Sequence, residues 1–156
     1  MKMYCYKISK HNPGKFKNGI YQADEWTDYS DIGKNFGYKV LTMDEYLKIE
    51  KNYINLILKI VEQTVSSALI IEGLENYDEV IWKNNQRISS AQLEQLIQDC
   101  LRNRCWCKVK SENFCLCFGY DFYIHICCCI PSKCIKKLCD EFSLFLHTPF
   151  SQVCKI

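Results

Sequence analysis

Cysteines are the residues of this chain with the most chemistry to offer, and there are twelve of them. Two Cys-x-Cys pairs, Cys105 with Cys107 and Cys115 with Cys117, lie close together in the second half of the chain. Alternate residues of a strand face the same side, so each pair would present two thiols together. If the intervening turn centres near Glu112, all four sulfurs share one face and could bind zinc. A turn shifted by half a residue separates the pairs onto opposite faces.

Apolar packing is the alternative for these cysteines, because free cysteine behaves as a small hydrophobe. A disulfide framework is not expected, since no export signal is found and a reducing cytosol keeps thiols free. His125 could pair with a thiol nucleophile, or it could be a hydrogen-bonded histidine beside the sheet. The sequence therefore predicts no cofactor and no metal, and a site made by Cys105, Cys107, Cys115 and Cys117 is the weaker alternative.

Nothing else in the sequence supports catalysis. The six glycines form no phosphate-binding loop, and neither HExxH nor a nucleophile elbow occurs. His11 lies in a basic stretch and is expected on a solvated face. His147 is expected at the C-terminal end of a helix, where a positive charge suits the dipole. The chain is therefore not expected to be an enzyme.

Two segments combine carboxylates with aromatic residues. They cover residues 24–31, with Trp26, and residues 72–82, with Trp82. Aromatic side chains supply contact area at interfaces, while fixed carboxylates select a basic partner. Each segment could instead be a solvated loop with its tryptophan in the core. The predicted interface residues are Asp24, Glu25, Asp28, Tyr29, Asp31, Glu72, Glu75, Tyr77, Asp78 and Glu79.

Length and charge limit the classes of protein that remain. A chain of 156 residues is long enough for one domain and too short for two ordinary ones. Lys and Arg total 20 against 18 for Asp and Glu, a balance that argues against a dedicated nucleic-acid binder. The apolar stretches at residues 54–61 and 124–130 are too short to cross a membrane. We expect one cytoplasmic domain over residues 1–156, with no membrane contact and no direct nucleic-acid binding.

Hydrophobic periodicity and capping residues predict an α+β fold. Strands are expected at residues 3–9, 68–72, 105–110, 114–118 and 122–130. Helices are expected at residues 42–66, 89–101 and 132–146, the first two opened by the capping boxes Thr42/Glu45 and Ser89/Gln92, and the last ended by Thr148–Pro149. Residues 10–40 form a long irregular segment with one helical turn near residues 30–35. The result is an antiparallel sheet with a C-terminal three-stranded meander, packed against about three helices.

Four stretches carry a family resemblance: residues 4–10 (YCYKISK), 24–33 (DEWTDYSDIG), 41–47 (LTMDEYL) and 118–123 (FGYDFY). On these stretches the chain resembles the small cytoplasmic immunity proteins of bacterial polymorphic-toxin and contact-dependent growth inhibition systems. The resemblance implies an inhibitor that binds one cognate toxin domain, such as a nuclease, and neutralises it by steric and electrostatic blocking. The high cysteine content lies outside this pattern. It leaves the alternative of a small cytosolic thiol-dependent enzyme, or a redox or zinc-binding protein, that uses the cysteine-rich sheet near His125.

Overall fold

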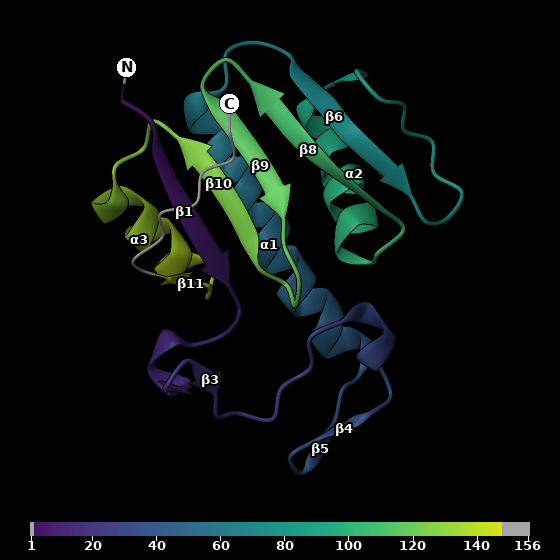
Figure 1. The fold of residues 1–156 in the computed structure, drawn as a ribbon, viewed down its shortest axis with the longest axis vertical. Coiled ribbons are helices and arrows are strands. Elements are labelled where there is room, and N and C mark those ends of the chain that lie inside the picture. Colours follow the sequence, from purple (N-terminus) through teal and green to yellow (C-terminus); the bar gives the residue numbers. More distant parts are fainter. Residues whose placement is uncertain (1, 148–156) are drawn as a thin grey trace.

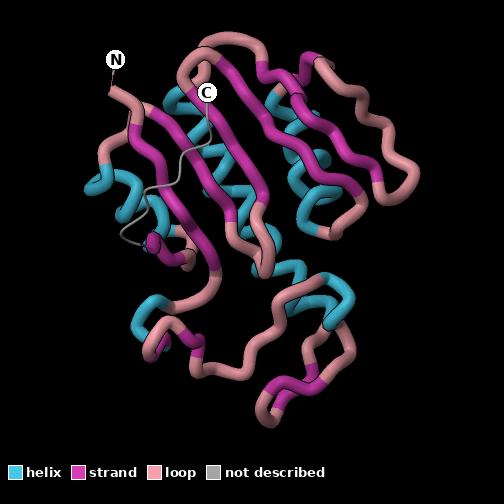
Figure 2. Tube along the Cα trace, viewed as in Figure 1, coloured by secondary structure: helices cyan, strands magenta, loops and turns pink. Residues whose placement is uncertain are grey.

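The computed structural model describes residues 2–147, which form three α-helices and a seven-stranded antiparallel sheet (Figures 1 and 2). The strand order is β11-β1-β10-β9-β8-β6-β7. The strands are β1 (Tyr4–Ser9), β6 (Leu69–Asn76), β7 (Arg87–Ile88), β8 (Cys105–Ser111), β9 (Phe114–Phe118), β10 (Ile124–Cys128) and β11 (Phe145–His147). The helices are α1 (Met43–Thr64), α2 (Ser90–Leu101) and α3 (Ser132–Glu141). The predicted α+β class and the meander β8-β9-β10 are confirmed.

The core lies between one face of the sheet and the helices, with α1 and α2 behind the sheet in Figure 1. Residues paired across antiparallel strands face the same side, so one row of the sheet can be followed from strand to strand. That row is Tyr6, Ile126, Leu116, Val109 and Ile71. All five side chains are buried. The alternation predicted from sequence therefore gives the sheet one apolar face, which the helices cover.

Side-chain caps fix where α1 and α2 begin. The hydroxyl of Ser89 accepts the Gln92 N–H at 3.3 Å and the Gln92 side chain accepts the Ser89 N–H at 2.9 Å, which confirms this capping box. The hydroxyl of Thr42 caps α1 by accepting the Glu45 N–H at 3.2 Å. The Glu45 carboxylate forms an ion pair with Lys39.

None of the helices among residues 2–147 has the length and apolar character that a membrane crossing requires.

The predicted third helix is too long. It ends at Glu141 because Ser143 takes a left-handed backbone (φ 57°), and residues 145–147 return as β11 against β1. Pro131 is its N-cap, with no side-chain cap. Phe145 is consequently exposed, and His147 lies on a strand instead of a helix end. The predicted stop at Thr148–Pro149 lies outside the described residues.

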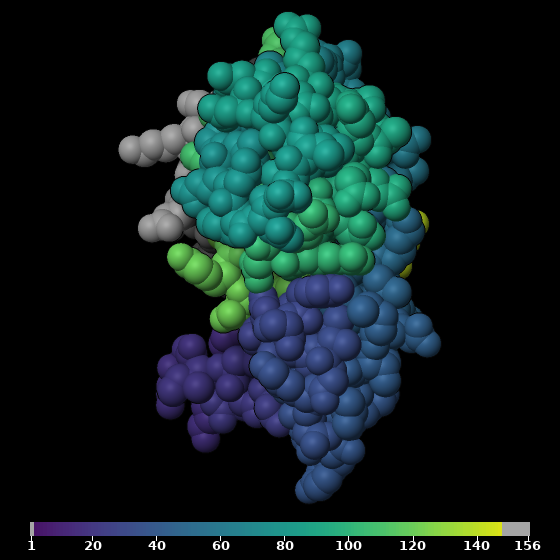
Figure 3. Space-filling model, turned by 90° about the vertical axis from the view of Figure 1, so that its right-hand side faces the viewer, coloured from purple at the N-terminus to yellow at the C-terminus, as the bar shows by residue number. Residues whose placement is uncertain are grey.

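Residues 10–42 form what we call the N-terminal lobe, at one end of the molecule (purple to blue in Figures 1 and 3). Its elements are η1 (Pro13–Lys15), β2 (Phe16–Lys17), β3 (Ile20–Tyr21), η2 (Tyr29–Asp31), β4 (Asn35–Phe36) and β5 (Lys39–Val40). The expected helical turn corresponds to η2. The two short hairpins, β2-β3 and β4-β5, were not predicted. Asn18 and Gly19 both have positive φ, which is the Asn-Gly signature of a tight hairpin turn.

Phe122 joins the N-terminal lobe to α1 and to the sheet. Its ring centroid lies 4.9 Å from that of Trp26 in the lobe, and 6.0 and 5.7 Å from those of Tyr46 and Tyr53 in α1. The Tyr53 hydroxyl also donates to the Phe122 carbonyl at 2.6 Å. These contacts hold Phe122 at φ 65°, a backbone region that a bulky residue avoids.

Replacing Phe122 tests this junction. We expect Phe122→Ala to lower the free energy of unfolding by about 3–5 kcal/mol, because three aromatic neighbours lose their contact. Urea unfolding followed by circular dichroism measures the change. The control is Tyr120→Ala, two residues earlier and 93% exposed, with an expected change of less than about 0.5 kcal/mol. Equal losses in the two variants would contradict the assignment.

Candidate functional site

A groove runs between the N-terminal lobe and the end of the sheet where β8 begins and β9 ends. Its larger cavity, of about 440 Å³, is lined by Glu75, Tyr77, Cys100, Asn103, Cys105, Trp106, Phe118, Gly119 and Tyr120. A smaller cavity of about 140 Å³ shares five of these residues and continues to Thr27 and Asp28 of the lobe. We call the two together the seam groove. Figure 3 shows this side, with the green part of the chain between the teal upper part and the blue lobe.

The end of α2 supplies one wall of the seam groove. Asn103 follows the helix in a left-handed conformation (φ 57°), which asparagine adopts more readily than most residues after a helix. Its backbone N–H donates to the Cys100 carbonyl at 3.2 Å. Its side-chain amide donates to the Asp28 carboxylate. Asn103 thus both ends α2 and fastens it to the N-terminal lobe beside the groove.

Arg104 fixes the loop that carries the second predicted segment. Its carbonyl accepts the N–H groups of Tyr77 and Asp78 at 3.0 and 3.1 Å. Its guanidinium donates to the Glu79 carbonyl at 2.6 Å and to the buried Asp99 carboxylate at 3.2 Å. Tyr77, Asp78 and Glu79 are exposed, and the Asp78 carboxylate lies 3.4 Å from the Arg104 guanidinium, so this loop is held at the rim of the groove.

Aromatic side chains and carboxylates dominate the seam groove. Tyr77 is 61% and Tyr120 is 93% exposed, an unusual state for large aromatic residues. The Trp106 indole is half-buried and donates to the Phe118 carbonyl at 2.8 Å. The lining carboxylates are Asp28, Glu75 and Asp121, and within residues 2–147 the lining contains no lysine or arginine. The groove is therefore negatively charged and aromatic.

The carboxylates of the first predicted segment mostly stabilise the lobe itself. Asp31 accepts the Thr27 N–H at 3.0 Å and lies 3.1 Å from the Lys34 ammonium. Burial opposes its charge, but the Thr27 N–H and Lys34 outweigh burial and hold the Asp31 pKa below its usual value. Asp24 accepts the Gly37 N–H at 2.7 Å. These two carboxylates organise η2 and the β4-β5 hairpin.

The other residues of this segment are also engaged internally. Glu25 lies 3.5 Å from the Lys10 ammonium and 3.4 Å from that of Lys15. Tyr29 packs edge-on against Tyr46 at 5.0 Å. Asp28 caps η2 through the Ser30 N–H at 2.9 Å, and it also lines the seam groove. Of the predicted interface residues in this segment, Asp28 alone is among the groove-lining residues.

The second segment divides between two places. Glu75 and Tyr77 line the seam groove, and the Tyr77 hydroxyl donates to the Glu75 carboxylate at 2.7 Å. Glu72 instead pairs with Lys110 at 3.0 Å on the sheet. Trp82 is buried, and its indole N–H donates to Asp99 at 2.7 Å. This agrees with the alternative that places the tryptophan of the segment in the core.

The groove residues that were not predicted as contacts include Asn103, Trp106 and Tyr120. Tyr120 stands in a predicted turn, where an aromatic residue has no core to enter, and this was a usable signal. Alternation along β8 places Trp106 on the opposite face from Cys105 and Cys107, which was a second signal. Asn103 gives no signal of its own, because its role depends on the position of Asp28.

The cysteine pairs lie on opposite faces of the sheet. Lys110 pairs with Cys115 and Lys108 with Cys117. The turn is therefore centred half a residue away from the position that would bring all four sulfurs to one face. On the helix side, the Cys100 sulfur lies 3.8 Å from those of Cys105 and Cys107. Within residues 2–147, no group of three or more His, Cys, Asp or Glu side chains is arranged to hold a metal ion. The alternative zinc site at Cys105, Cys107, Cys115 and Cys117 is therefore wrong.

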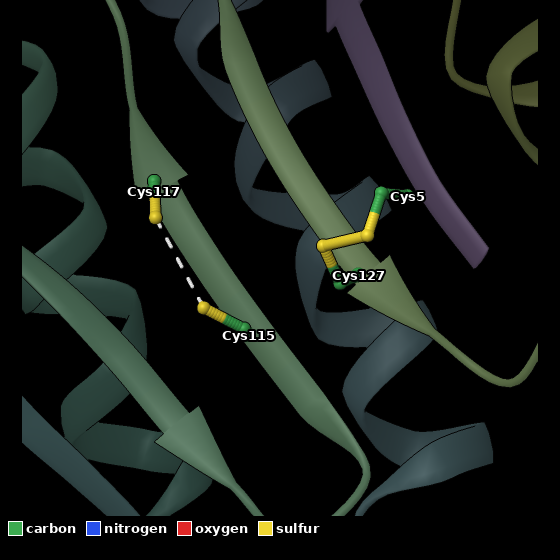
Figure 4. The surroundings of a disulfide bond; sticks show 4 residues. All are labelled: Cys5, Cys115, Cys117 and Cys127. Carbon is green, nitrogen blue, oxygen red and sulfur yellow. Dashed lines mark hydrogen bonds between the residues drawn. A yellow bond between two sulfur atoms is a disulfide. The ribbon is translucent and has the colours of Figure 1, made fainter. Parts of the chain in front are cut away.

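A disulfide joins β1 to β10, contrary to the expectation of free thiols. It links Cys5 to Cys127, which face one another in the strand register (Figure 4). The Cys115 and Cys117 sulfurs lie 4.0 Å apart on the neighbouring strand, on the same face of the sheet. His125 lies opposite Cys117 in this register. The cysteine-rich face thus combines a disulfide, two further sulfurs and an imidazole.

Two histidines belong to a buried cluster at the junction with the lobe. His11, expected on a solvated face, is 3% exposed, and its Nε2 lies 2.7 Å from the Asp121 carbonyl oxygen. His147 Nε2 lies 2.7 Å from the Ser9 hydroxyl. Burial, with the charge of Lys7, lowers the His147 pKa to about 4, and burial also lowers that of His11. Both imidazoles are therefore neutral at pH 7.

No family model, curated protein or solved structure matches this chain. Support for a function therefore comes from the fold and the seam groove. The fold and the site define an α+β protein with an open, carboxylate-bearing aromatic groove at the boundary of its N-terminal lobe.

The histidine cluster predicts a loss of stability on mild acidification. Unfolded histidine has a pKa of about 6.5, so the unfolded chain takes up protons before the folded one does. Stability is complete above that pH and falls as the pH drops toward the folded pKa of His147, about 4. We expect a loss of about 1–2 kcal/mol between about pH 7 and pH 4.5, measured by urea unfolding. His147→Gln should have a shallower profile, and identical profiles would contradict the prediction.

Reduction tests the disulfide. Its two cysteines are 122 residues apart, so the bond restricts a large part of the unfolded chain. We expect dithiothreitol to lower the free energy of unfolding by about 2–4 kcal/mol, and Cys5→Ser to show the same loss without responding to dithiothreitol. Cys134→Ser, an exposed position on α3, is the control. Equal stability of the oxidised and reduced protein would contradict this role.

Proposed function

We propose that this chain is an immunity protein that binds one cognate toxin domain and neutralises it by steric and electrostatic blocking. The observation that supports this most is the seam groove, where exposed aromatic side chains lie beside Glu75 and Asp28. Aromatic residues with rim carboxylates are typical of surfaces that bind basic proteins. The resemblance to immunity proteins supplies the class of partner.

Electrostatics favour a toxin that handles a phosphate-bearing substrate. Nucleases bind phosphates with lysine and arginine side chains, so a carboxylate surface would compete with the nucleic acid for these side chains. Glu75, Asp78 and Glu79 are exposed along the loop that Arg104 holds in place. A loop fixed before binding loses less conformational entropy in the complex. These features suit a preformed inhibitory surface.

The contact surface differs from the one that the sequence indicates for residues 24–31. Glu25 and Asp31 form ion pairs with lysines within the lobe, so a partner would meet little of their negative charge. In the second segment, Glu72 pairs with Lys110 and Asp78 with Arg104. Glu75, Tyr77 and Glu79 are exposed, and Asp28 lines the groove while it accepts the Asn103 amide. We therefore place the interface on Glu75, Tyr77, Glu79 and Asp28.

A second candidate is thiol chemistry on the cysteine-rich face. One observation favours it: the Cys5–Cys127 disulfide lies beside Cys115 and Cys117, with His125 across from Cys117. The sulfurs of Cys115, Cys117 and Cys127 are buried, which limits contact with a substrate. Oxidation of a substrate dithiol to a disulfide, with the Cys5–Cys127 bond reduced to two thiols in exchange, that disappears in Cys5→Ser would support this candidate, and no such activity would end it.

Charge reversal tests the proposed interface. The partner to use is the product of the neighbouring gene, tested first for toxicity in cells and then inactivated at its active site for binding measurements. We expect the double variant Glu75→Lys/Glu79→Lys to weaken the complex at least about tenfold, equal to about 1.4 kcal/mol. The loss should fall mainly on the association rate and shrink at high salt. Surface plasmon resonance at two salt concentrations measures both.

The matched control is Glu112→Lys, an exposed carboxylate at the turn between β8 and β9. It should leave affinity within about twofold, since it lies at the opposite end of β8 from the groove. In cells, the wild-type chain should rescue growth during expression of the active toxin, and the double variant should not. A neighbouring gene product that is harmless, or that forms no complex, would contradict the proposed function.

A further inference from the structure

We infer that the larger cavity of the seam groove binds an arginine side chain of the partner, held against Tyr77 and Tyr120 and paired with Glu75. This inference deepens the proposed function and rests on it for the identity of the partner. It states which kind of side chain this cavity binds. A small arginine peptide can test that binding in the absence of a toxin.

The shape of the cavity suits one long side chain. Its volume of about 440 Å³ falls in the range of ligand pockets, and it stays open to solvent beside Tyr120. Phe118 and Trp106 supply apolar lining, and their link through the indole N–H fixes the Trp106 ring. A flexible aliphatic stem can lie along this surface while its charged end reaches the rim.

The charge of the cavity calls for a cation. Its lining contains the Glu75 carboxylate, and the described lining residues include no basic side chain. The Tyr77 hydroxyl donates to one Glu75 oxygen at 2.7 Å, which holds the carboxylate next to this tyrosine. Aromatic faces attract cations, and the attraction grows as water is excluded.

A guanidinium fits these groups better than an ammonium. Its plane stacks on tyrosine rings, while its fork of N–H donors matches a carboxylate. Asn103 lines both cavities, and its side-chain oxygen provides a further acceptor. The Asp28 carboxylate, which accepts the Asn103 amide, lines the smaller cavity. Lysine has one compact charge and cannot use the rings and the carboxylates in the same way.

The test is a titration of ¹⁵N-labelled protein with the blocked peptide Gly-Arg-Gly-Arg-Gly, against the same peptide with citrulline in place of arginine. Citrulline keeps the shape and removes the charge. We expect the Trp106 indole N–H signal to shift saturably with the arginine peptide, with a dissociation constant of about 1 mM, and not with citrulline. Trp26 and Trp82 are buried and serve as internal references.

Variants separate ring stacking from other contacts. Tyr120→Ala should weaken arginine-peptide binding at least about threefold and Tyr77→Ala/Tyr120→Ala more than about tenfold, whereas Tyr120→Phe keeps the ring and should bind like the wild type. Tyr38→Ala, an exposed tyrosine in the N-terminal lobe, is the control. Each of these positions is exposed, so the variants should fold, which circular dichroism verifies.

Equal binding of the two peptides, or no shift at Trp106 with either, would overturn the inference. The failure of the proposed function looks different. If the arginine peptide binds but the neighbouring toxin does not, the arginine site stands and the immunity role falls. If the toxin binds with unchanged affinity to Tyr77→Ala/Tyr120→Ala and the peptide does not bind, the immunity role stands and the arginine site falls.

Discussion

The packing of Phe122 is the constraint on which the remaining structure depends. Its left-handed backbone turns the chain between β9 and β10, and its ring sits among Trp26, Tyr46 and Tyr53. Three parts of the molecule therefore meet at one side chain: the lobe, α1 and the sheet. Burial at this point outweighs the cost of an unfavourable φ. The neighbouring Tyr120 is left outside, at the groove.

The seam groove follows from this junction. The lobe is long and has little regular structure, so its position depends on a few strong contacts. Within the lobe, the buried Lys10 ammonium lies over the Trp26 ring at 4.3 Å and close to Glu25. At the junction with the helices, the Arg102 guanidinium lies 5.1 Å from the Tyr29 ring centroid and makes a bidentate contact with the buried Glu50 carboxylate of α1, at 2.8 and 2.9 Å. With the lobe in this position, the end of α2, the start of β8 and the end of β9 do not pack closely against it, and the seam groove lies between them.

Much of the fold follows from local sequence signals. Thr42 and Ser89 mark the starts of two helices, and alternation identifies the meander strands. The end of α3 does not follow, because the apolar period of Ile135, Leu138 and Cys139 continues past the turn at Ser143. Strand register is also hard to predict, since a half-residue shift in the turn between β8 and β9 decides whether Cys115 and Cys117 share a face with Cys105 and Cys107.

The candidate site is harder to predict than the fold. Exposed carboxylates at residues 75–79 follow from composition, but whether a charge is free depends on neighbours distant in sequence. Glu25 and Glu75 are both acidic residues near aromatic ones, yet Glu25 is paired with Lys10 and Glu75 faces a groove. Asn103 meets Asp28 only because α2 ends beside the lobe. Such pairings come from tertiary packing, which no local pattern encodes.

Hydrogen–deuterium exchange of the free and toxin-bound protein tests the central claim most directly. If the seam groove is the contact surface, toxin binding slows exchange at residues 74–79, 103–106 and 118–121, which come together only in the fold. Protection confined to the cysteine-rich face of β9 and β10, or to residues 16–40 of the lobe, would contradict the account.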